Sequence, residues 1–201
     1  MKDLREKILK KYKICTPLQS LRFFDSPELQ KITAQTYVKE KYSDKNDLIH
    51  ITNKKLNKKI RIGYYSADFR NHAMSFLLAN LYELHDKSKF ELFAFSFGPE
   101  KKDEMYYRIS AAFDQFIDVK LKSDDEIMKL SRELKIDVAI DLMTFTQYHR
   151  FEIFTKRCAP IQINYLGYPG TSGASCFDYI IADKTLIPKK NQKQITTLSR
   201  Q

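Results

Sequence analysis

The feature that most constrains this chain is an alternation of short apolar runs with amphipathic stretches, which begins at Ile60 and continues to Asp183. Between the runs, apolar residues recur at helical spacing, as they do from Met74 to Leu81. Strands that alternate with helices predict βαβ units and a mainly parallel, doubly wound Rossmann-like α/β sheet. The apolar runs lie at 60–66, 90–97, 116–119, 138–143, 161–167 and 178–183, and the helical stretches that follow Leu81 at 103–112, 123–134 and 150–157.

The N-terminal part of the chain is more polar and predicts helices instead of strands. Ser26 is expected to cap a helix whose first residue is Pro27, because proline has no amide to leave unpaired at that position. The Lys- and Asn-rich stretch 53–59 indicates a linker. We therefore expect three parts: a helical segment with its linker over 1–56, a Rossmann-like lobe over 57–190, and an irregular tail over 191–201.

The chain carries a net charge of +10, from 35 basic and 25 acidic side chains. Such an excess is compatible with a nucleic-acid partner or a phosphate-bearing ligand. The lysines are spread from Lys2 to Lys193 without the single block that a basic arm shows, so solvated surfaces are the favoured explanation and nucleic acid is not an expected partner.

Cysteine usage and hydropathy exclude several other classes. Cys15, Cys158 and Cys176 lie far apart and show no metal-ligand spacing, which predicts free thiols, no metal site and no disulfide framework. The N-terminus lacks an apolar core of signal-peptide length, and no run of about eighteen apolar residues occurs. We therefore expect a soluble, cytoplasmic protein without membrane contact.

In a doubly wound sheet, the segments after the strands are where ligands bind. After the run 60–66 come Asp68, Asn71 and His72, just before a helix. His72 could exchange a proton or hydrogen-bond a sugar hydroxyl. The alternative is a capping cluster, in which Asp68 or Asn71 caps the helix and His72 lies in its first turn. The charged turn after 90–97 is interpreted as solvated.

Two later segments are also candidates for ligand contact. Asp141, Thr144 and Thr146 offer a carboxylate and two hydroxyls, although Thr146 could instead cap the next helix. Residues 167–173 contain three of the five glycines, which allow close backbone approach and positive φ. This run matches neither the Walker A nor the dinucleotide fingerprint, so it is either a rigid ligand-facing loop or a structural turn.

Long segments of the sequence resemble one family. The stretches CAPIQINYLGYPGTSG (158–173), DYIIAD (178–183) and RIGYYSADFRNHAMSFLL (61–78) are similar to the O-GlcNAc transferases and SPINDLY-like proteins, in the same order and at matching distances. DSPELQKITAQTYVKEKY (25–42) resembles the helices that precede the catalytic region of that family. The resemblance covers about residues 25–190.

The resemblance implies a GT-B architecture, in which a nucleotide sugar binds between two Rossmann-like lobes. It implies transfer of a sugar, typically GlcNAc from UDP-GlcNAc, to Ser or Thr hydroxyls of an acceptor protein, with no metal and no cofactor beyond the donor. The active-site histidine of the family falls on His72. The donor-facing loop falls on Leu166, Gly167, Tyr168, Pro169 and Gly170, and we add Thr171 to it as a candidate.

The chain also departs from the family pattern. A family histidine is replaced by Phe76, a family glycine by Thr144, and a family acidic pair aligns with Glu100 and Lys101. No second Rossmann-like pattern follows within the 201 residues. We therefore expect the first lobe of a glycosyltransferase that is inactive alone, with a non-catalytic protein- or sugar-binding module as the alternative.

Overall fold

The computed structural model describes residues 2–42, 51, 57–99 and 101–189, and in this part of the chain the predicted sheet forms. Six parallel strands lie in the order β3-β2-β1-β4-β5-β6. This is the strand order of a Rossmann-like sheet, whose direction of winding reverses between β1 and β4. The predicted fold class is confirmed. The strands are β1 (Ile60–Ser66), β2 (Phe90–Ser96), β3 (Gln115–Asp118), β4 (Val138–Asp141), β5 (Ile161–Tyr165) and β6 (Tyr179–Ile181).

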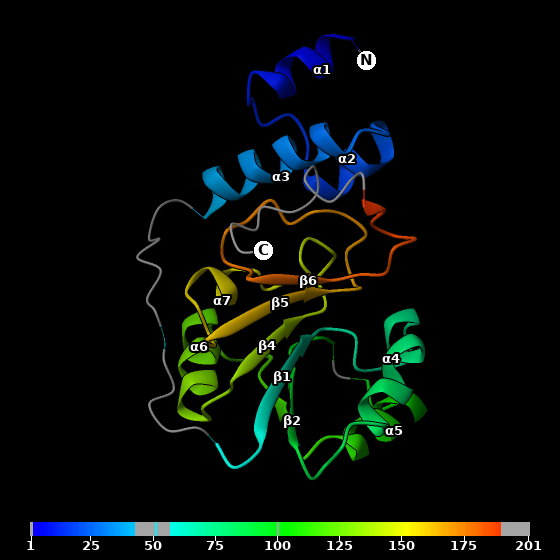
Figure 1. Cartoon of the computed structure of the whole chain (residues 1–201), viewed down its shortest axis with the longest axis vertical. Coiled ribbons are helices and arrows are strands. Elements are labelled where there is room, and N and C mark those ends of the chain that lie inside the picture. The colour runs from blue at the N-terminus through cyan, green and yellow to red at the C-terminus, as the bar shows by residue number, and fades with distance from the viewer. Residues whose placement is uncertain (1, 43–50, 52–56, 100, 190–201) are drawn as a thin grey trace.

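Helices cover both faces of the sheet (Figure 1). On one face lie α4 (Ala73–Glu83) and α5 (Glu104–Ala112), and on the other lie α6 (Asp124–Glu133) and α7 (Glu152–Thr155). α6 begins with the capping box that Ser123 and Glu126 predict.

Successive residues of β1 show how the two cores form. Because side chains of a strand alternate between its faces, Tyr64 and Tyr65 belong to different buried clusters. Tyr64 packs edge-on against Tyr82 of α4, with ring centroids 5.0 Å apart. Tyr65 stacks on Phe95 of β2 at 4.4 Å. The near-continuous apolar strands are therefore explained by burial of both sheet faces.

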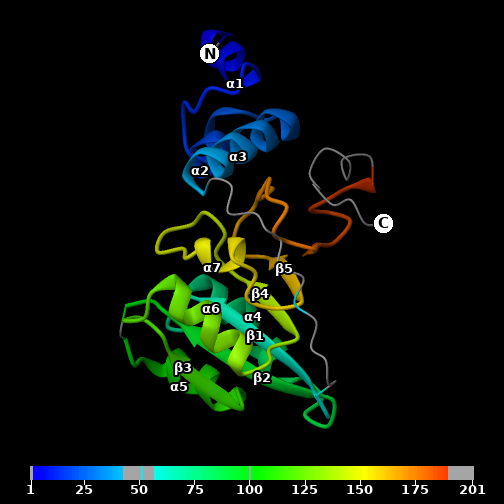
Figure 2. The same cartoon turned by 90° about the vertical axis from the view of Figure 1, so that its left-hand side faces the viewer.

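Three helices precede the sheet: α1 (Lys2–Leu9), α2 (Pro17–Phe23) and α3 (Pro27–Lys41). Ser26 caps α3 as predicted, since its side chain accepts the amide of Leu29. Ala34 and Tyr37 of α3 are buried in the same cluster as Tyr65 of the sheet. Figure 2 shows α2 and α3 above β5 and the loops beside it. Although α3 shares a core with the lobe, the division into three parts stays a prediction.

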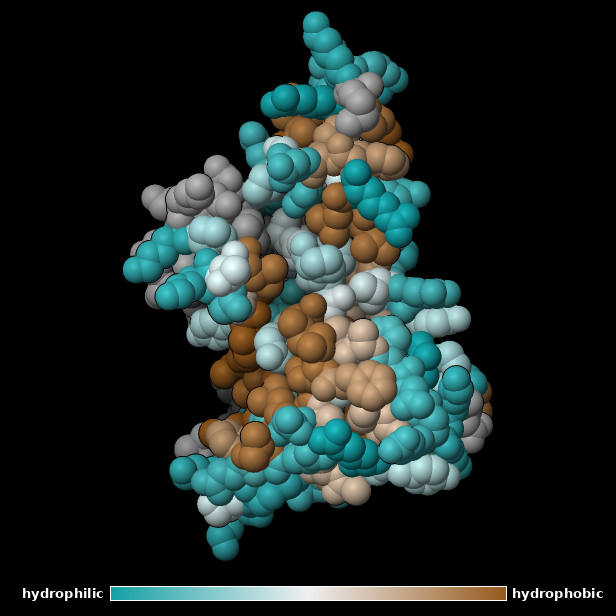
Figure 3. Space-filling model, turned by 90° about the vertical axis from the view of Figure 1, so that its right-hand side faces the viewer, coloured by the Kyte–Doolittle hydropathy of each residue, from teal (hydrophilic) through white to brown (hydrophobic). Residues whose placement is uncertain are grey.

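The outward face of α4 is apolar. Phe76, Leu77 and Leu84 are 63%, 66% and 82% exposed, and with Leu81 they follow the helical repeat. Figure 3 shows hydrophobic residues gathered on the side of the molecule to which α4 and α5 belong.

Several predicted elements end earlier than expected. The runs 138–143 and 161–167 form strands only to Asp141 and Tyr165, and the helix expected over 150–157 spans only Glu152–Thr155. Residue Leu166 adopts φ +61°, which ends an extended strand. Most of the predicted linker (53–56), Glu100 and the predicted tail (191–201) lie outside the described residues.

Candidate functional site

The candidate site lies at the carboxyl edge of the sheet, where the strand order reverses. Open α/β sheets bind ligands in the crevice at this switch point. Here the loops after β1 and β4 meet: the Ser66 hydroxyl lies 3.5 Å from the sulfur of Met143, and the Leu142 amide donates to the Tyr65 carbonyl at 3.2 Å. The topology therefore brings His72 and Thr146, far apart in sequence, to loops on either side of the switch point.

Two glycines hold neighbouring loops together at this edge. A Cβ on Gly98, after β2, would lie 1.8 Å from the carbonyl oxygen of Ala67, after β1. A Cβ on Gly167, after β5, would lie 1.6 Å from the carbonyl oxygen of Leu142, after β4. Both positions exclude any side chain, so close backbone approach is what these glycines provide. The loops after β1, β2, β4 and β5 form one contiguous rim.

Local hydrogen bonds fix the loop after β1. The Asp68 amide donates to the Ser66 hydroxyl at 2.9 Å, and the Ser75 hydroxyl donates to the Asp68 carbonyl. The Asn71 amide donates to both carboxylate oxygens of Asp103, the N-cap of α5, at 2.8 and 2.9 Å. This loop is therefore tied to its own helix and to the next one.

His72 itself caps α4, which corrects the expectation that Asp68 or Asn71 would do so. Its Nδ1 accepts the amide of Met74 at 3.3 Å. An Asx-type cap needs an acceptor on a short side chain, and the imidazole Nδ1 occupies the equivalent position. The His72 side chain is 38% exposed, so the ring combines its structural role with access to solvent.

Charged groups surround the histidine. The Asp68 carboxylate, 10% exposed, lies 3.1 Å from the Arg70 guanidinium and 3.5 Å from Nδ1 of His72. Nε of Arg70 is buried and has no hydrogen-bond partner in the structure. The Asn71 side chain is exposed at the rim. Predicted ligand contacts of Asp68 and Asn71 stay predictions, because the hydrogen bonds shown here shape the loop.

Asp141 is buried and organises the loop after β4. Its carboxylate accepts the amide of Met143 at 2.9 Å and both the amide and hydroxyl of Thr144 at 3.0–3.2 Å. Asn164 of β5 donates to the same hydroxyl. Burial raises the pKa of Asp141, against the opposing effect of these hydrogen bonds. Since its oxygens are occupied within the protein, the geometry supports a loop-shaping role, and direct ligand contact stays untested.

The backbone conformation explains how Thr144 can replace the glycine of the family pattern. Thr144 is fully buried and adopts φ +48°, in the left-handed region that glycine enters freely. A glycine at this position in the family pattern would adopt this conformation without strain. In this chain, hydrogen bonds to Asp141 and Asn164 hold the threonine there.

Thr146 does not cap the following helix. Its hydroxyl donates to the Met143 carbonyl at 2.9 Å, and the N-cap of α7 is Phe151, which makes no side-chain cap hydrogen bond. The side chain is half-buried. Of the two interpretations from the sequence, the capping alternative is wrong and ligand contact stays a prediction.

We define residues 166–173 as the glycine-rich loop. Leu166 and Pro169 are exposed, whereas Tyr168 is 5% exposed and packs edge-on against Phe145 at 5.3 Å. The Thr171 hydroxyl accepts the amide of Gly173 at 3.2 Å. Tyr168 and Thr171 are therefore anchors of the loop, while Leu166 and Pro169 are its accessible side chains.

The other glycines of the loop meet the N-terminal helices. Gly170 faces the Tyr168 ring and Leu21 of α2. A Cβ added to Gly170 would lie 2.9 Å from the Tyr168 ring and 3.0 Å from the Leu21 side chain. Gly173 alone of the three adopts a positive φ, +63°, and a Cβ there would meet the Gln35 amide of α3 at 2.7 Å. The sequence offered no signal for this docking, because it depends on tertiary contacts with residues about 140 positions earlier.

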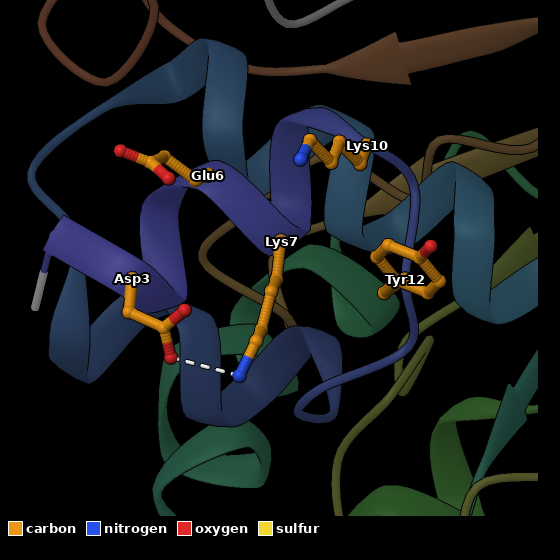
Figure 4. A pocket seen from close by; sticks show the side chains of 5 residues that line it. All are labelled: Asp3, Glu6, Lys7, Lys10 and Tyr12. Atoms are coloured by element: carbon orange, nitrogen blue, oxygen red, sulfur yellow. Dashed lines mark hydrogen bonds and ion pairs between the residues drawn. The ribbon is translucent and has the colours of Figure 1, made fainter.

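A hollow lies in the N-terminal part of the molecule, beside α1. It has a volume of about 440 Å³ and is formed by one side of α1 and the segment after it (Figure 4). Opposite charges line it, and Lys7 is paired with Asp3 at 2.8 Å. Figure 1 places α1 at the end of the molecule opposite β2, so this hollow is separate from the candidate site. It is lined by Asp3, Glu6, Lys7, Lys10 and Tyr12.

The described residues hold neither a cluster suited to a metal ion nor a helix suited to a membrane span. These residues contain no cluster of three or more His, Cys, Asp or Glu side chains suited to a metal ion. None of their helices has the length and apolar character needed to cross a bilayer. The expectations about metal, cofactor and location stay predictions.

Comparisons with known proteins agree with this geometry. A model of the family described as glycosyl transferase family 41 matches residues 29–198. A probable UDP-N-acetylglucosamine–peptide N-acetylglucosaminyltransferase of Arabidopsis thaliana, SEC, is 37% identical over 131 residues, which are 65% of this chain and 13% of that protein. A Caenorhabditis elegans protein with the same activity in its name is 34% identical over 65% of this chain and 11% of its own.

A solved structure shows the same fold. A mutant of the Thermobaculum terrenum O-GlcNAc transferase superposes with a TM-score of 0.79 at 27% identity, over 88% of this chain and 34% of that one. The Arabidopsis SPINDLY protein is 31% identical over 70% of this chain and 16% of its own length. The chain thus spans about a third of the solved relative and about an eighth of the SEC and Caenorhabditis relatives.

Proposed function

The chain belongs to glycosyltransferase family 41, and on this premise we propose that it forms the first lobe of an enzyme that transfers GlcNAc from UDP-GlcNAc to Ser or Thr hydroxyls of proteins. The observation that carries the proposal is the contiguous rim at the switch point, on a lobe whose fold matches an O-GlcNAc transferase. The names of the curated relatives supply the donor and the peptide acceptor.

The bonds that change in the reaction determine what the protein must supply. The acceptor oxygen forms a bond to the anomeric carbon, the bond from that carbon to the diphosphate breaks, and the hydroxyl loses its proton. Hydrogen-bond donors must stabilise the negative charge that develops on the leaving diphosphate. His72 and the exposed part of the glycine-rich loop are the groups of this lobe that we assign to the donor.

We assign the remaining side of the crevice to a second lobe outside these residues. Catalysis by proximity and electrostatics requires both walls of the crevice. Loss of one wall therefore removes transition-state stabilisation equal to many times the roughly 1.4 kcal/mol that corresponds to a tenfold change in rate. We therefore expect the 201-residue chain to bind no donor productively and to show no turnover alone.

The test compares two proteins in one assay. The first is the 201-residue chain, and the second is the same chain joined to a second lobe from its own gene or from a family member, here called the completed enzyme. Transfer from radiolabelled UDP-GlcNAc to an acceptor protein should occur only with the completed enzyme. UDP release by the 201-residue chain would contradict the two-lobe requirement, and a well-folded completed enzyme without transfer would contradict the proposed reaction.

A further inference from the structure

The segment after β2 holds the loop after β1 at three points. The Phe97 amide donates to the Ser66 carbonyl at 3.2 Å. Gly98 lies so close to the backbone of the next residue of that loop that no side chain would fit between them. Further along, the Asp103 carboxylate accepts the amide of Asn71. The first two contacts are made by backbone alone, so Asp103 is the side chain among the three whose substitution can release the loop.

The Asp103 carboxylate serves two elements at once. Both of its oxygens accept the Asn71 amide, Oδ1 at 2.9 Å and Oδ2 at 2.8 Å, and Oδ1 also accepts the Tyr106 amide at 3.0 Å as the cap of α5. Partial burial acts to raise the pKa of Asp103, but the two amides and the charges of Lys101 and Arg70 lower it overall. The carboxylate is therefore ionised at neutral pH, and hydrogen bonds to an ionised acceptor are the stronger kind.

The position of Asn71 makes this tie relevant to the candidate site. Asn71 directly precedes His72, the N-cap of α4, so Asp103 fixes the backbone at the start of α4 relative to the start of α5. The two helices are also joined elsewhere, because Nε of Arg108 in α5 donates to the Glu83 carboxylate of α4 at 2.7 Å. Loss of the Asp103 carboxylate therefore leaves the helix pair joined and acts on the loop.

We propose that Asp103 is a positioning residue of the transfer, whose carboxylate holds the loop after β1 in the conformation that the reaction requires. This inference rests on the proposed function and adds a residue from α5 to the groups that support it. Without the carboxylate, the Asn71 amide turns to water and the residues beside it gain freedom. A displacement of about 1 Å in a group that positions substrate costs roughly 10²-fold in rate.

The first test measures the tie itself in the 201-residue chain. In Asp103→Ser, the serine hydroxyl is a good N-cap and retains an acceptor for the Tyr106 amide, but one neutral oxygen replaces the two charged ones that hold Asn71. Amide hydrogen exchange followed by NMR should be faster at Asn71 by about tenfold or more and nearly unchanged at Tyr106. Unchanged exchange at Asn71 would overturn the proposal, and this measurement requires no transfer.

The second test measures sugar transfer by the completed enzyme. We expect Asp103→Ser to lower kcat by about 10–10²-fold, while the melting temperature of the 201-residue chain changes little because the cap is retained. Asp103→Asn keeps Oδ1, the atom that accepts both amides, and should recover part of the rate. A parent rate in Asp103→Ser, measured per folded molecule, would show that Asp103 only caps α5 and would refute the positioning role.

Ser123→Ala is the matched control. It removes the cap of α6, on the other face of the sheet, where the Ser123 hydroxyl accepts the Glu126 amide at 3.3 Å. It should lower the melting temperature more than Asp103→Ser does and leave kcat per folded molecule unchanged. An equal loss of kcat in Ser123→Ala would attribute the effect to stability and refute the proposal. A completed parent enzyme without transfer would instead refute the proposed function, and the positioning role with it.

Discussion

Gly167 offers the sharpest test of the contiguous rim. In Gly167→Ala, the new methyl carbon would lie 1.6 Å from the Leu142 carbonyl oxygen and 2.5 Å from its carbon. Real Cβ atoms almost never approach other heavy atoms closer than 3.0 Å, so the two loops must separate by at least about 1.4 Å. Neither neighbour is a flexible side chain, and the shift therefore moves the backbone of both loops.

The size of the effect follows from that displacement. A misplacement of about 1 Å in a group that positions substrate costs roughly 10²-fold in rate. We therefore expect the completed enzyme to lose at least about 100-fold in sugar transfer. Overpacking costs about 1–3 kcal/mol in stability, which corresponds to a decrease of roughly 2–12 °C in melting temperature for a chain of this size.

Gly170→Ala is the matched control in the same loop. There the new carbon meets the Tyr168 ring at 2.9 Å and Leu21 at 3.0 Å, both of them side chains that can shift by a few tenths of an ångström. The transfer rate of both variants is measured in the completed enzyme, and their melting temperature is measured in the 201-residue chain. We expect Gly170→Ala to stay within about threefold of the parent rate. Equal rates for Gly167→Ala and the parent would refute the argument from close backbone approach.

Three further predictions concern the 201-residue chain itself. Burial raises the pKa of Asp141, so the protonated carboxyl group stabilises the folded chain most below the unfolded-state pKa of 3.8, and this stabilisation is lost as the pH rises through the raised folded-state pKa. Urea unfolding from about pH 4 to 7 should therefore show that the parent loses stability relative to Asp141→Asn. A constant difference in stability between the two proteins would contradict the pKa shift. Gly173→Ala should destabilise by more than about 1 kcal/mol in thermal unfolding, because its φ is +63° and its Cβ would contact α3; an unchanged melting temperature would show that the loop does not depend on this docking. Burial raises the pKa of Cys158 to about 12 and raises that of Cys176 as well. At about pH 8 a thiol reagent should therefore modify the half-buried Cys15 first, and all three cysteines only after denaturation. Rapid labelling of all three thiols in the native chain would contradict the burial of Cys158 and Cys176.

The sheet could be predicted because its pattern is local. The run 60–66 forms β1 with the same bounds, since its apolar residues alternate with no competing signal. The ends of β4 and β5 could not be predicted, because the apolar runs continue through Met143 and Leu166 although the strands have already ended. The turn after β4 comes from the Asp141 carboxylate, and the turn after β5 from a positive φ at a leucine.

The site was predictable in its residues but not in their roles. The sequence placed His72 at the mouth of the crevice and left open whether it was a capping or a chemical group, and the structure shows the cap. Tertiary contacts decided the rest: the tie from Asn71 to Asp103 joins two loops 32 residues apart, and Gly173 docks on α3. Such pairings depend on the whole fold and leave no local pattern.

The most direct test of the central claim is to map where a nucleotide sugar lies on this lobe. The completed enzyme would be labelled with a photoactivatable analogue of UDP-GlcNAc, digested and analysed by mass spectrometry, with excess UDP-GlcNAc as competitor. We expect competed adducts in the loop that contains His72 and in residues 166–173. Competed adducts confined to α1, or adducts that excess UDP-GlcNAc does not suppress, would contradict the assignment of the donor to this edge of the sheet.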